Sequence, residues 1–545
     1  MNAHSRPALA PRCARAARSS LRAAPTAGGG QALNAQAEGT AVDPSQSGVH
    51  SDRSATACRA AGAVRVDSDA AAWSGRVSPL AALLQPVDAA WLAVFRAAFG
   101  VVLGISMLRF LAYGWVDRFF VSPAFHFKYW GFAWVEPLPA AAMHALFWVL
   151  AGLAFAVAVG FSFRVSALLF ALGLGYVQLI DVTTYLNHYY LAVLLAGLLA
   201  VSPAARVWSV DAWIAARLRR RPPPAASVPA GVLYLFRFQV ALVYIFAALA
   251  KLQGDWLLHA QPLRIWLGAK VDLPLIGPLF TLAWVPLALS WAGFLFDATI
   301  VGWLMMRRTR PWAYALVIGF HALTRLLFPI GMFPAIMIVS ALVFFSPSWP
   351  RRLARTLLRV TTGRVWPALR AAAPERGGAR GASARSSRWA VACAMAYGVL
   401  QLALPLRSLA YGGDVLWHEQ GMRFSWRVMV RAKGGNTTFL VRDRASGRTV
   451  YVSPREYLSD LQESEMSSQP DLILQLAHHI HHDYARRGFH DPEVRVDARA
   501  SLNGRRSAAL IDPTIDLAKV REGLAPATWI APAPRLPPPH TRPVL

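Results

Sequence analysis

The chain contains nine long runs of mainly apolar residues, which constrain its fold more than any other feature. They lie approximately over residues 89–112, 139–159, 164–181, 189–201, 231–253, 278–304, 312–327, 331–346 and 388–404. A bilayer core about 30 Å thick needs about 20 mainly apolar residues per crossing helix. The chain has 545 residues, 55% hydrophobic and 16% charged, which is unlike a soluble protein. We therefore predict an α-helical polytopic membrane protein.

Eight or nine of these runs are expected to be transmembrane helices. Three of them, 189–201, 312–327 and 331–346, are short, but short helices are tolerated where they line a cavity within a bundle. Loop charge favours nine. The loops 202–230, 305–311 and 347–388 carry +4, +3 and +9 and residues 1–78 carry +4, whereas the alternate loops 113–138, 182–188 and 254–277 each sum to zero.

The same charge pattern predicts the orientation of the chain. Basic loops stay in the cytoplasm, so nine spans place the N-terminus in the cytoplasm and everything after about residue 405 outside. A bacterial inner membrane, with the C-terminal region in the periplasm, fits this pattern. The net charge of +27 is then explained by the basic loops, and we expect no nucleic-acid partner.

The rest of the chain divides by composition. Residues 1–78 are expected to be a disordered tail, 79–346 the main helical bundle, 347–388 a basic cytoplasmic linker, 389–410 the last transmembrane helix, 411–532 an extramembrane α+β domain and 533–545 a Pro-rich trailing tail. The three cysteines all precede residue 411, so no disulfide bond is expected within the α+β domain.

Inside the α+β domain, alternation of apolar and polar residues predicts strands. The stretches RFSWRVMVRA and TTFLVRD are expected to pair, with Gly434, Gly435 and Asn436 forming the turn between them. Residues 470–487 have helical periodicity, and residues 493–502 again alternate as a strand does.

Ionisable residues inside apolar spans are costly and mark functional sites by default. Seven stand in or at the ends of the predicted spans: Arg96, Asp181, His188, Lys251, Asp297, His321 and Arg325. A lone charge in hydrocarbon needs a partner, so we expect Asp297 to pair with Arg325 or Arg96. For Asp297 and His321, a structural role in helix packing stands beside a catalytic one.

Lys251, in VYIFAALAKLQGDW, is the strongest catalytic candidate. Burial disfavours the ammonium form and favours a neutral amine that can take a proton from a weak acid such as a quinol. The alternative is that the side chain extends to the membrane interface and serves no reaction. His188, preceded by Asn187, lies on the same predicted side of the membrane; it is either a structural hydrogen-bonding residue or a part of the same site.

The tract HHIHHD at 478–483 is a weak metal signal, because two histidines one helical turn apart lack a third ligand at a recognisable spacing. We predict no metal site. No phosphate-binding glycine loop, nucleophile elbow or HExxH motif is found, so nucleotide and hydrolase chemistry have no support.

Several motifs, in the same order, resemble those of a known family over residues 88–532. They are DAAWLAVFRAAFG (88–100), FHFKYWGFAWVEPLP (125–139), DVTTYLNHYYL (181–191), VWSVDAW (207–213), YIFAALAKLQGDW (244–256), FPIGMFPAIMI (328–338), RFSWRVMV (423–430), YVSPREY (451–457) and IDPTIDL (511–517). The family is that of the vitamin K-dependent gamma-carboxylases and their bacterial relatives, the horizontally transferred transmembrane domain proteins.

The resemblance implies a membrane enzyme that couples oxidation of reduced vitamin K, a naphthoquinol of the menaquinol type, by O2 to capture of CO2 by the γ-carbon of glutamate. The products are vitamin K epoxide and γ-carboxyglutamate. It implies that Lys251 is the base that deprotonates the quinol. Asn187 and His188 would support the oxygenated intermediate or the abstracted glutamate, and His321 matches a further family histidine.

We therefore predict an outward-facing site lined by Lys251, Asn187, His188 and His321, with Arg96 and Asp297 as weaker candidates for binding the naphthoquinol. The expected partners are membrane lipid, the quinol and a Glu-containing peptide or protein received by the α+β domain. Two alternatives remain: a quinol oxygenase without carboxylase activity, and a non-enzymatic quinone-binding, lipid-binding or transport protein. A cavity shared by Lys251 and His188 would favour the enzyme.

Overall fold

The computed structural model describes residues 79–219, 225–362 and 384–539, which all belong to one compact unit, Asp67–Leu545. The expected tail at 1–78, residues 363–383 of the expected linker and residues 540–545 lie outside the described residues.

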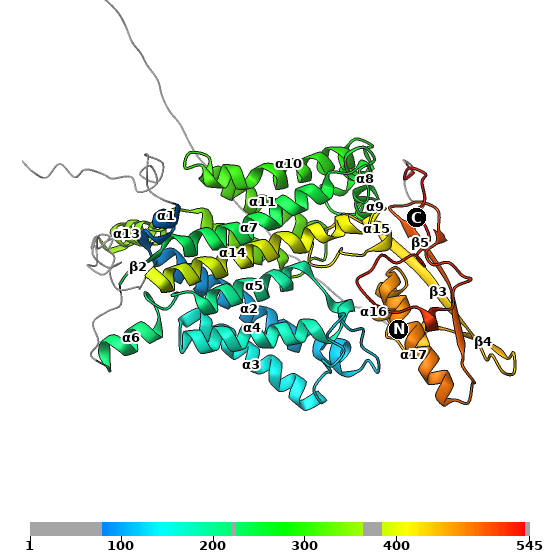
Figure 1. Ribbon diagram of the computed structural model, residues 1–545. Helices are drawn as coiled ribbons and strands as arrows, with labels where there is room; N and C mark the ends of the chain where they lie inside the picture. Colours follow the sequence, from blue (N-terminus) through cyan, green and yellow to red (C-terminus); the bar gives the residue numbers. More distant parts are fainter. Residues whose placement is uncertain (1–78, 220–224, 363–383, 540–545) are drawn as a thin grey trace, which may run out of the picture. The chain divides into compact units, whose positions relative to one another are not determined.

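Each of the nine apolar runs contains a helix (Figure 1). These helices are α2 (Ala90–Ala112), α3 (Ala140–Val159), α4 (Phe163–Ile180), α5 (Asn187–Val201), α7 (Ala230–Lys251), α10 (Val285–Met305), α11 (Arg310–Leu327), α12 (Phe333–Ala341) and α14 (Ala384–Leu406). The other helices of this part of the chain are α1 (Pro79–Leu84), α6 (Val210–Arg217), α8 (Gly254–Leu257), α9 (Leu263–Gly268) and α13 (Trp349–Thr362).

Within the described ranges, six helices are long and apolar enough to cross a membrane: α2, α3, α4, α7, α10 and α14. A seventh is obtained if α12 and α13, which are bent by 96° with respect to each other, are counted as one span. Helix α5 is apolar but shorter. The chain is thus a mostly helical multi-pass membrane protein, and the total of eight or nine spans remains a prediction.

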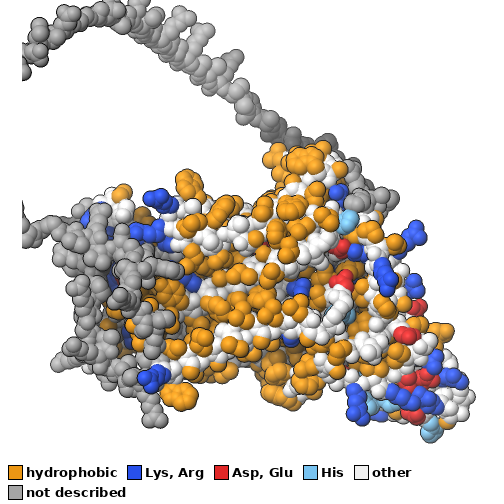
Figure 2. Space-filling view, turned by 45° about the horizontal axis from the view of Figure 1, so that its top comes forward, with side chains coloured by type: hydrophobic (Ala, Val, Ile, Leu, Met, Phe, Trp, Pro, Cys, Tyr) orange, Lys and Arg blue, Asp and Glu red, His pale blue; other side chains and the backbone are white. Residues whose placement is uncertain are grey.

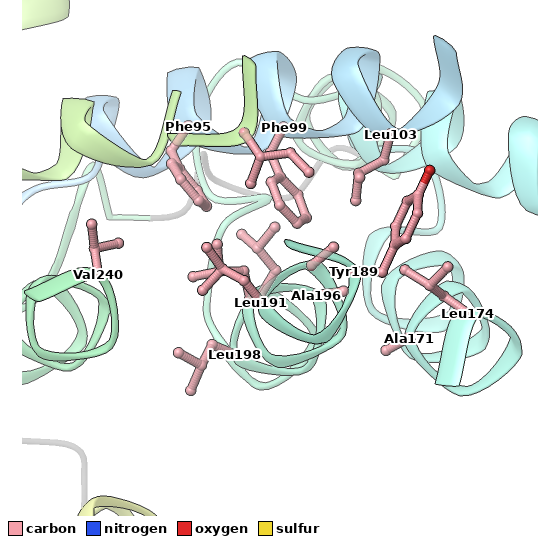
Figure 3. Packing of buried hydrophobic residues seen from close by; sticks show 14 of the residues in the cluster. Phe95, Phe99, Leu103, Ala171, Leu174, Tyr189, Leu191, Ala196, Leu198 and Val240 are labelled. Carbon is pink, nitrogen blue, oxygen red and sulfur yellow. The ribbon is translucent and has the colours of Figure 1, made fainter. Parts of the chain in front are cut away.

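The centre of the bundle is packed from α2, α3, α4, α5 and α7. Figure 3 shows Phe95, Phe99 and Leu103 pointing from α2 toward α5, where Leu191 and Ala196 lie; all five are buried. Because lipid is as apolar as these side chains, close packing rather than the hydrophobic effect holds such helices together.

Gly100 marks a close approach of two of these helices. A Cβ atom at this position would lie 2.6 Å from the carbonyl oxygen of Ala154 on α3. Only glycine lets the backbones of α2 and α3 come this close, as small residues do at membrane helix interfaces.

The outer surface of the bundle is apolar, as lipid contact requires. Figure 2 shows hydrophobic side chains spread over the face of the helices, whereas charged side chains gather at the ends. Trp148 on α3, Leu172 on α4 and Met395 on α14 are 61%, 61% and 65% exposed. Exposed apolar area of this extent on a soluble protein would lead to association, so it supports the membrane assignment.

Three segments that the charge pattern placed on one side of the membrane meet at one end of the bundle. Arg351 in α13 donates from Nε to both carboxylate oxygens of Asp88, just before α2, at 3.1 and 3.0 Å. Its guanidinium also lies over the ring of Trp208, 5.3 Å from the centroid. The segment 347–388 is therefore not a plain linker, because its first part forms the helix α13.

The C-terminal domain contains a four-stranded antiparallel sheet with the order β4-β3-β5-β6. The strands are β3 (Lys433–Arg442), β4 (Thr449–Val452), β5 (Glu493–Leu502) and β6 (Ala508–Ala509). Helices α15 (Val415–His418), α16 (Asp460–Met466) and α17 (Pro470–Arg486) belong to the same domain. Alternate residues of β5, among them Val494, Val496 and Ala498, are buried with Ile473 and Ile480 of α17. The predicted strand 493–502 and helix 470–487 are confirmed.

The predicted hairpin between 423 and 443 is wrong. Residues 423–432 form no strand, and Gly434, Gly435 and Asn436 lie inside β3 rather than in a turn. A Cβ at Gly435 would lie 2.0 Å from the carbonyl oxygen of Ser467, between α16 and α17. This glycine therefore marks a close backbone approach over the sheet and not a turn.

The apolar alternation of 423–430 arises from packing against the bundle. Trp426 is 1% exposed and its ring stacks on Tyr190 of α5, with centroids 4.9 Å apart. Phe424 contacts the same tyrosine ring at 4.9 Å.

Residues 533–539, which were expected to trail, contact the C-terminal domain. Arg505 donates from Nε to the carbonyl oxygen of Leu536 at 2.7 Å.

Candidate active site

A pocket lies at the end of α7 where Lys251 ends the helix. Its cavity has a volume of about 110 Å³. Its wall comes from α7, α8, α9, α10, α11 and the start of α12, and from Val428 and Met429 of the C-terminal region. Most lining residues are apolar, and the ionisable ones include Lys251 on α7, Asp297 on α10 and His321 on α11.

Lys251 forms a buried ion pair with Asp297 in this pocket. The Nζ atom lies 2.7 Å from Oδ2 of Asp297 on α10, and each side chain is 8% exposed. The expected pairing of Asp297 with Arg325 or Arg96 is therefore wrong: Arg325 is exposed at the end of α11. The lysine does not extend into lipid or solvent, so its charge is balanced inside the bundle.

Trp256 is a pocket residue that the sequence reasoning missed. Lys251 Nζ lies 5.2 Å from the centroid of its ring, in cation–π geometry. The indole Nε1 donates to the carbonyl oxygen of Ser290 on α10 at 2.8 Å, and the Ser290 hydroxyl donates to the carbonyl oxygen of Trp256. This reciprocal pair fixes α8 against α10. Its position five residues after Lys251 in the matched motif could have pointed to it.

His321 lines the same pocket from α11. Its Nε2 atom lies 3.4 Å from the hydroxyl of Tyr244 on α7, and the residue is 1% exposed. The Nδ1 atom has no hydrogen-bond partner in the described part of the chain. A buried, unpaired polar atom at a pocket wall is available to a ligand.

His188 and Asn187 lie beside the pocket, and neither is among its lining residues. The imidazole of His188 is 6.1 Å, centroid to centroid, from the ring of Phe333, which itself is 5.6 Å from the imidazole of His321. Phe333 is a pocket residue and contacts both histidines. The structure thus brings Lys251 and His321 into one cavity and leaves His188 next to it.

Asn187 is held by a hydrogen bond that also reaches the C-terminal region. The Tyr185 hydroxyl donates to Oδ1 of Asn187 at 2.9 Å and accepts from the backbone N–H of Phe424 at 2.9 Å. Phe424 belongs to the segment 423–430 that supplies Val428 and Met429 to the pocket wall. The amide of Asn187 is therefore oriented at the junction between bundle and C-terminal domain.

Arg96 is not brought to the pocket. Its NH1 atom donates to the carbonyl oxygen of Val157 at 3.0 Å, and NH2 donates to that of Trp208 at 2.7 Å. Val157 lies in the last turn of α3, where carbonyl groups lack partners within the helix and favour a cation. These two hydrogen bonds hold the guanidinium group of Arg96 at the basic end of the bundle.

Asp181 connects the helical bundle to the C-terminal domain. Its carboxylate accepts hydrogen bonds from Nε2 of Gln462 on α16 at 2.8 Å and from Oγ1 of Thr183 at 2.7 Å, and it lies 3.1 Å from Nδ1 of His126. The side chain is 1% exposed. These contacts join the end of α4 to the C-terminal domain.

A second contact between the bundle and the C-terminal domain lies next to the Lys251 site. Arg505 donates from NH1 and NH2 to the two carboxylate oxygens of Asp255 at 2.6 and 2.7 Å, and Asn503 adds a bond of 2.8 Å. Partial burial acts to raise the pKa of Asp255, but these hydrogen bonds outweigh it and lower that pKa. Because Asp255 adjoins Trp256, the C-terminal domain is tied directly to the pocket wall.

The histidine tract does not converge on one point. Nε2 of His478 bonds the carbonyl oxygens of Leu517 and Val520 at 3.1 and 2.8 Å, and Nδ1 of His481 bonds that of Pro492 at 2.7 Å. Across the described ranges, no three His, Cys, Asp or Glu side chains are grouped so that they could hold a metal ion.

Two parts of the chain match models of known families. Residues 84–349 match the HTTM domain, and residues 386–535 match the lumenal domain of vitamin K-dependent gamma-carboxylase. No solved structure matches the chain. The first region covers most of the helical bundle, and the second covers α14 and the C-terminal domain. Together they show that the chain belongs to the vitamin K-dependent gamma-carboxylase family.

Proposed function

We propose that the protein is a membrane enzyme that oxidises a naphthoquinol with O2 to its epoxide and couples this oxidation to carboxylation of glutamate. The observation that carries the proposal is the Lys251–Asp297 pair, 2.7 Å apart, in a mainly apolar pocket at the end of α7. A fused-ring quinol matches the apolar wall, and its hydroxyl groups need the few polar side chains that this pocket has. Gamma-carboxylase chemistry requires vitamin K hydroquinone, O2 and CO2 as substrates.

The lysine and the aspartate are proposed to act as one proton-accepting unit. In the resting pair a single ammonium faces a single carboxylate, so the pair is electrically neutral. A proton taken from a quinol hydroxyl makes the pair cationic and leaves a quinolate anion beside it. Attraction between the two opposite charges is strong where water is excluded, which favours deprotonation of the quinol at this position.

His321, His188 and Asn187 are proposed to complete the site. His321 offers its Nδ1 atom, which has no hydrogen-bond partner among the described residues, at the pocket wall. His188 and Asn187 stand on the side where the segment 423–430 closes the pocket, the side from which a glutamate side chain held by the C-terminal domain would enter. A dry site protects a strongly basic oxygen species from solvent protons.

The proposal is tested with purified full-length protein in detergent, reduced vitamin K and O2, with and without a Glu-containing peptide and labelled CO2. Formation of epoxide that is lost in Lys251→Met supports the oxygenase, and label in the peptide supports the carboxylase. Epoxide without label favours a quinol oxygenase alone. Folded protein that forms no epoxide with any peptide contradicts the proposal and favours binding or transport.

A further inference from the structure

Helix α13 (Trp349–Thr362) runs at nearly a right angle to the helix before it. The axes of the α12 segment and of α13 differ by 96°. Arg351, which is 4% exposed, fixes the first turn of α13 to the residues just before α2, because it pairs with Asp88. It also lies over the ring of Trp208. The helix therefore lies across one end of the bundle, where three basic segments meet (Figure 1).

The two outer faces of α13 differ in chemistry. With 3.6 residues per turn, Arg352, Arg355 and Arg359 fall on one face. The opposite outer face carries Leu353, Leu357 and Val360, which are 50%, 54% and 80% exposed. The helix contains no acidic residue.

These features are typical of a helix that lies at the membrane interface. An amphipathic helix with arginines on one face and aliphatic side chains on the other lies in the membrane interface plane, with its apolar face between acyl chains. Arginine binds phosphate oxygens through paired N–H donors. Anionic lipid headgroups complement a helix whose charged residues are all arginine, whereas zwitterionic headgroups do not.

We propose that α13 is an interfacial helix that binds anionic phospholipid headgroups through Arg352, Arg355 and Arg359, with Leu353, Leu357 and Val360 inserted among the acyl chains. The partner is the lipid leaflet at the basic end of the bundle. Arg351 takes no part in lipid binding, since Asp88 already neutralises it. This surface is independent of the pocket at Lys251.

The first experiment compares lipid retention in nanodiscs made from phosphatidylcholine with and without phosphatidylglycerol. Protein released from them is analysed by native mass spectrometry. The parent is expected to retain phosphatidylglycerol preferentially, and the Arg352→Gln, Arg355→Gln, Arg359→Gln variant is expected to lose this preference by about tenfold or more, as basic residues near an anionic surface contribute roughly fivefold each. The control changes Arg442, Arg499 and Arg521 of the C-terminal domain to Gln, with the same loss of charge.

A second experiment keeps all three arginines and so does not depend on the folding of the triple variant. A fluorophore is attached at Leu357→Cys in a variant whose three native cysteines are replaced by serine. Quenching by acyl-chain spin labels is expected. Quenching by aqueous iodide alone would overturn the proposal, and so would protection from both quenchers, which would show a protein partner or a second copy over this face. Equal lipid preference in the parent and triple variant would also overturn it.

Discussion

Lys251 on α7 and Asp297 on α10 form a buried ion pair, with Nζ and Oδ2 separated by 2.7 Å and with each side chain 8% exposed. The two residues are 46 positions apart in the chain. The pair couples the end of one apolar helix to the middle of another, and the ring of Trp256 lies 5.2 Å from the lysine Nζ.

Removing the lysine is expected to end quinol oxidation and also to destabilise the bundle. Lys251→Met leaves the Asp297 charge buried without a partner, at a cost of about 3–5 kcal/mol. The double variant with Asp297→Asn removes both charges and is expected to regain most of the thermal stability without regaining epoxide formation. Thermal unfolding and epoxide assays separate the two effects.

Lys270→Met is the matched control for this experiment, because Lys270 lies in the loop after α9 and does not line the pocket. Its activity should equal that of the parent. Epoxide formation by the stable double variant would show that neither residue takes the quinol proton.

The Asp255–Arg505 contact is expected to hold the C-terminal domain against the pocket wall. Arg505→Lys keeps the charge but loses the two parallel hydrogen bonds, which Arg alone provides. We expect the KM for the Glu peptide to rise several-fold. Because the segment 254–277 is then held less firmly, we also expect a protease to cleave it faster than in the parent. Peptide kinetics and limited proteolysis measure the two effects.

A charge exchange tests this assignment further. Asp255→Arg alone places two cations together and should have the largest effect, and adding Arg505→Asp should recover part of the loss. No recovery in the exchanged variant, with parent-like folding, would argue against a role for the ion pair itself.

Gly435→Ala is expected to destabilise the C-terminal domain by about 2–4 kcal/mol, as overpacking of a tight backbone contact does. Its Cβ would lie 2.0 Å from the carbonyl oxygen of Ser467, so the connection between α16 and α17 must move. Gly434→Ala is the matched control, since a Cβ there meets nothing within 4 Å. Thermal unfolding of the two variants should differ clearly; equal midpoints would contradict the steric explanation.

His478 is expected to make the stability of the C-terminal domain depend on pH. The hydrogen bond to Glu522, with Nδ1 and Oε1 3.5 Å apart, raises the pKa of His478 above its ordinary value. A raised pKa in the folded state means that this stabilisation is complete below the unfolded pKa of about 6.5 and is lost as the pH rises through the folded pKa.

The unfolding midpoint of the parent is therefore expected to fall slightly more between about pH 5.5 and 8 than that of Glu522→Gln. The effect is small because both side chains are partly exposed. Parallel pH profiles for the two proteins would show that the pair does not contribute.

The apolar runs determined the helices by themselves, because crossing a bilayer requires about 20 apolar residues in continuous sequence, and the matched motifs pointed to Lys251 and the family. The pairing of Lys251 with Asp297 and of Asp255 with Arg505 depended on tertiary structure, since each joins residues that only helix packing and domain docking bring together. The segment 423–430 shows the same limit: its alternation is typical of a strand, yet Trp426 packs on α5 and the pattern records burial against the bundle. A periodic pattern specifies which side chains are buried, whereas their partners are set by the fold.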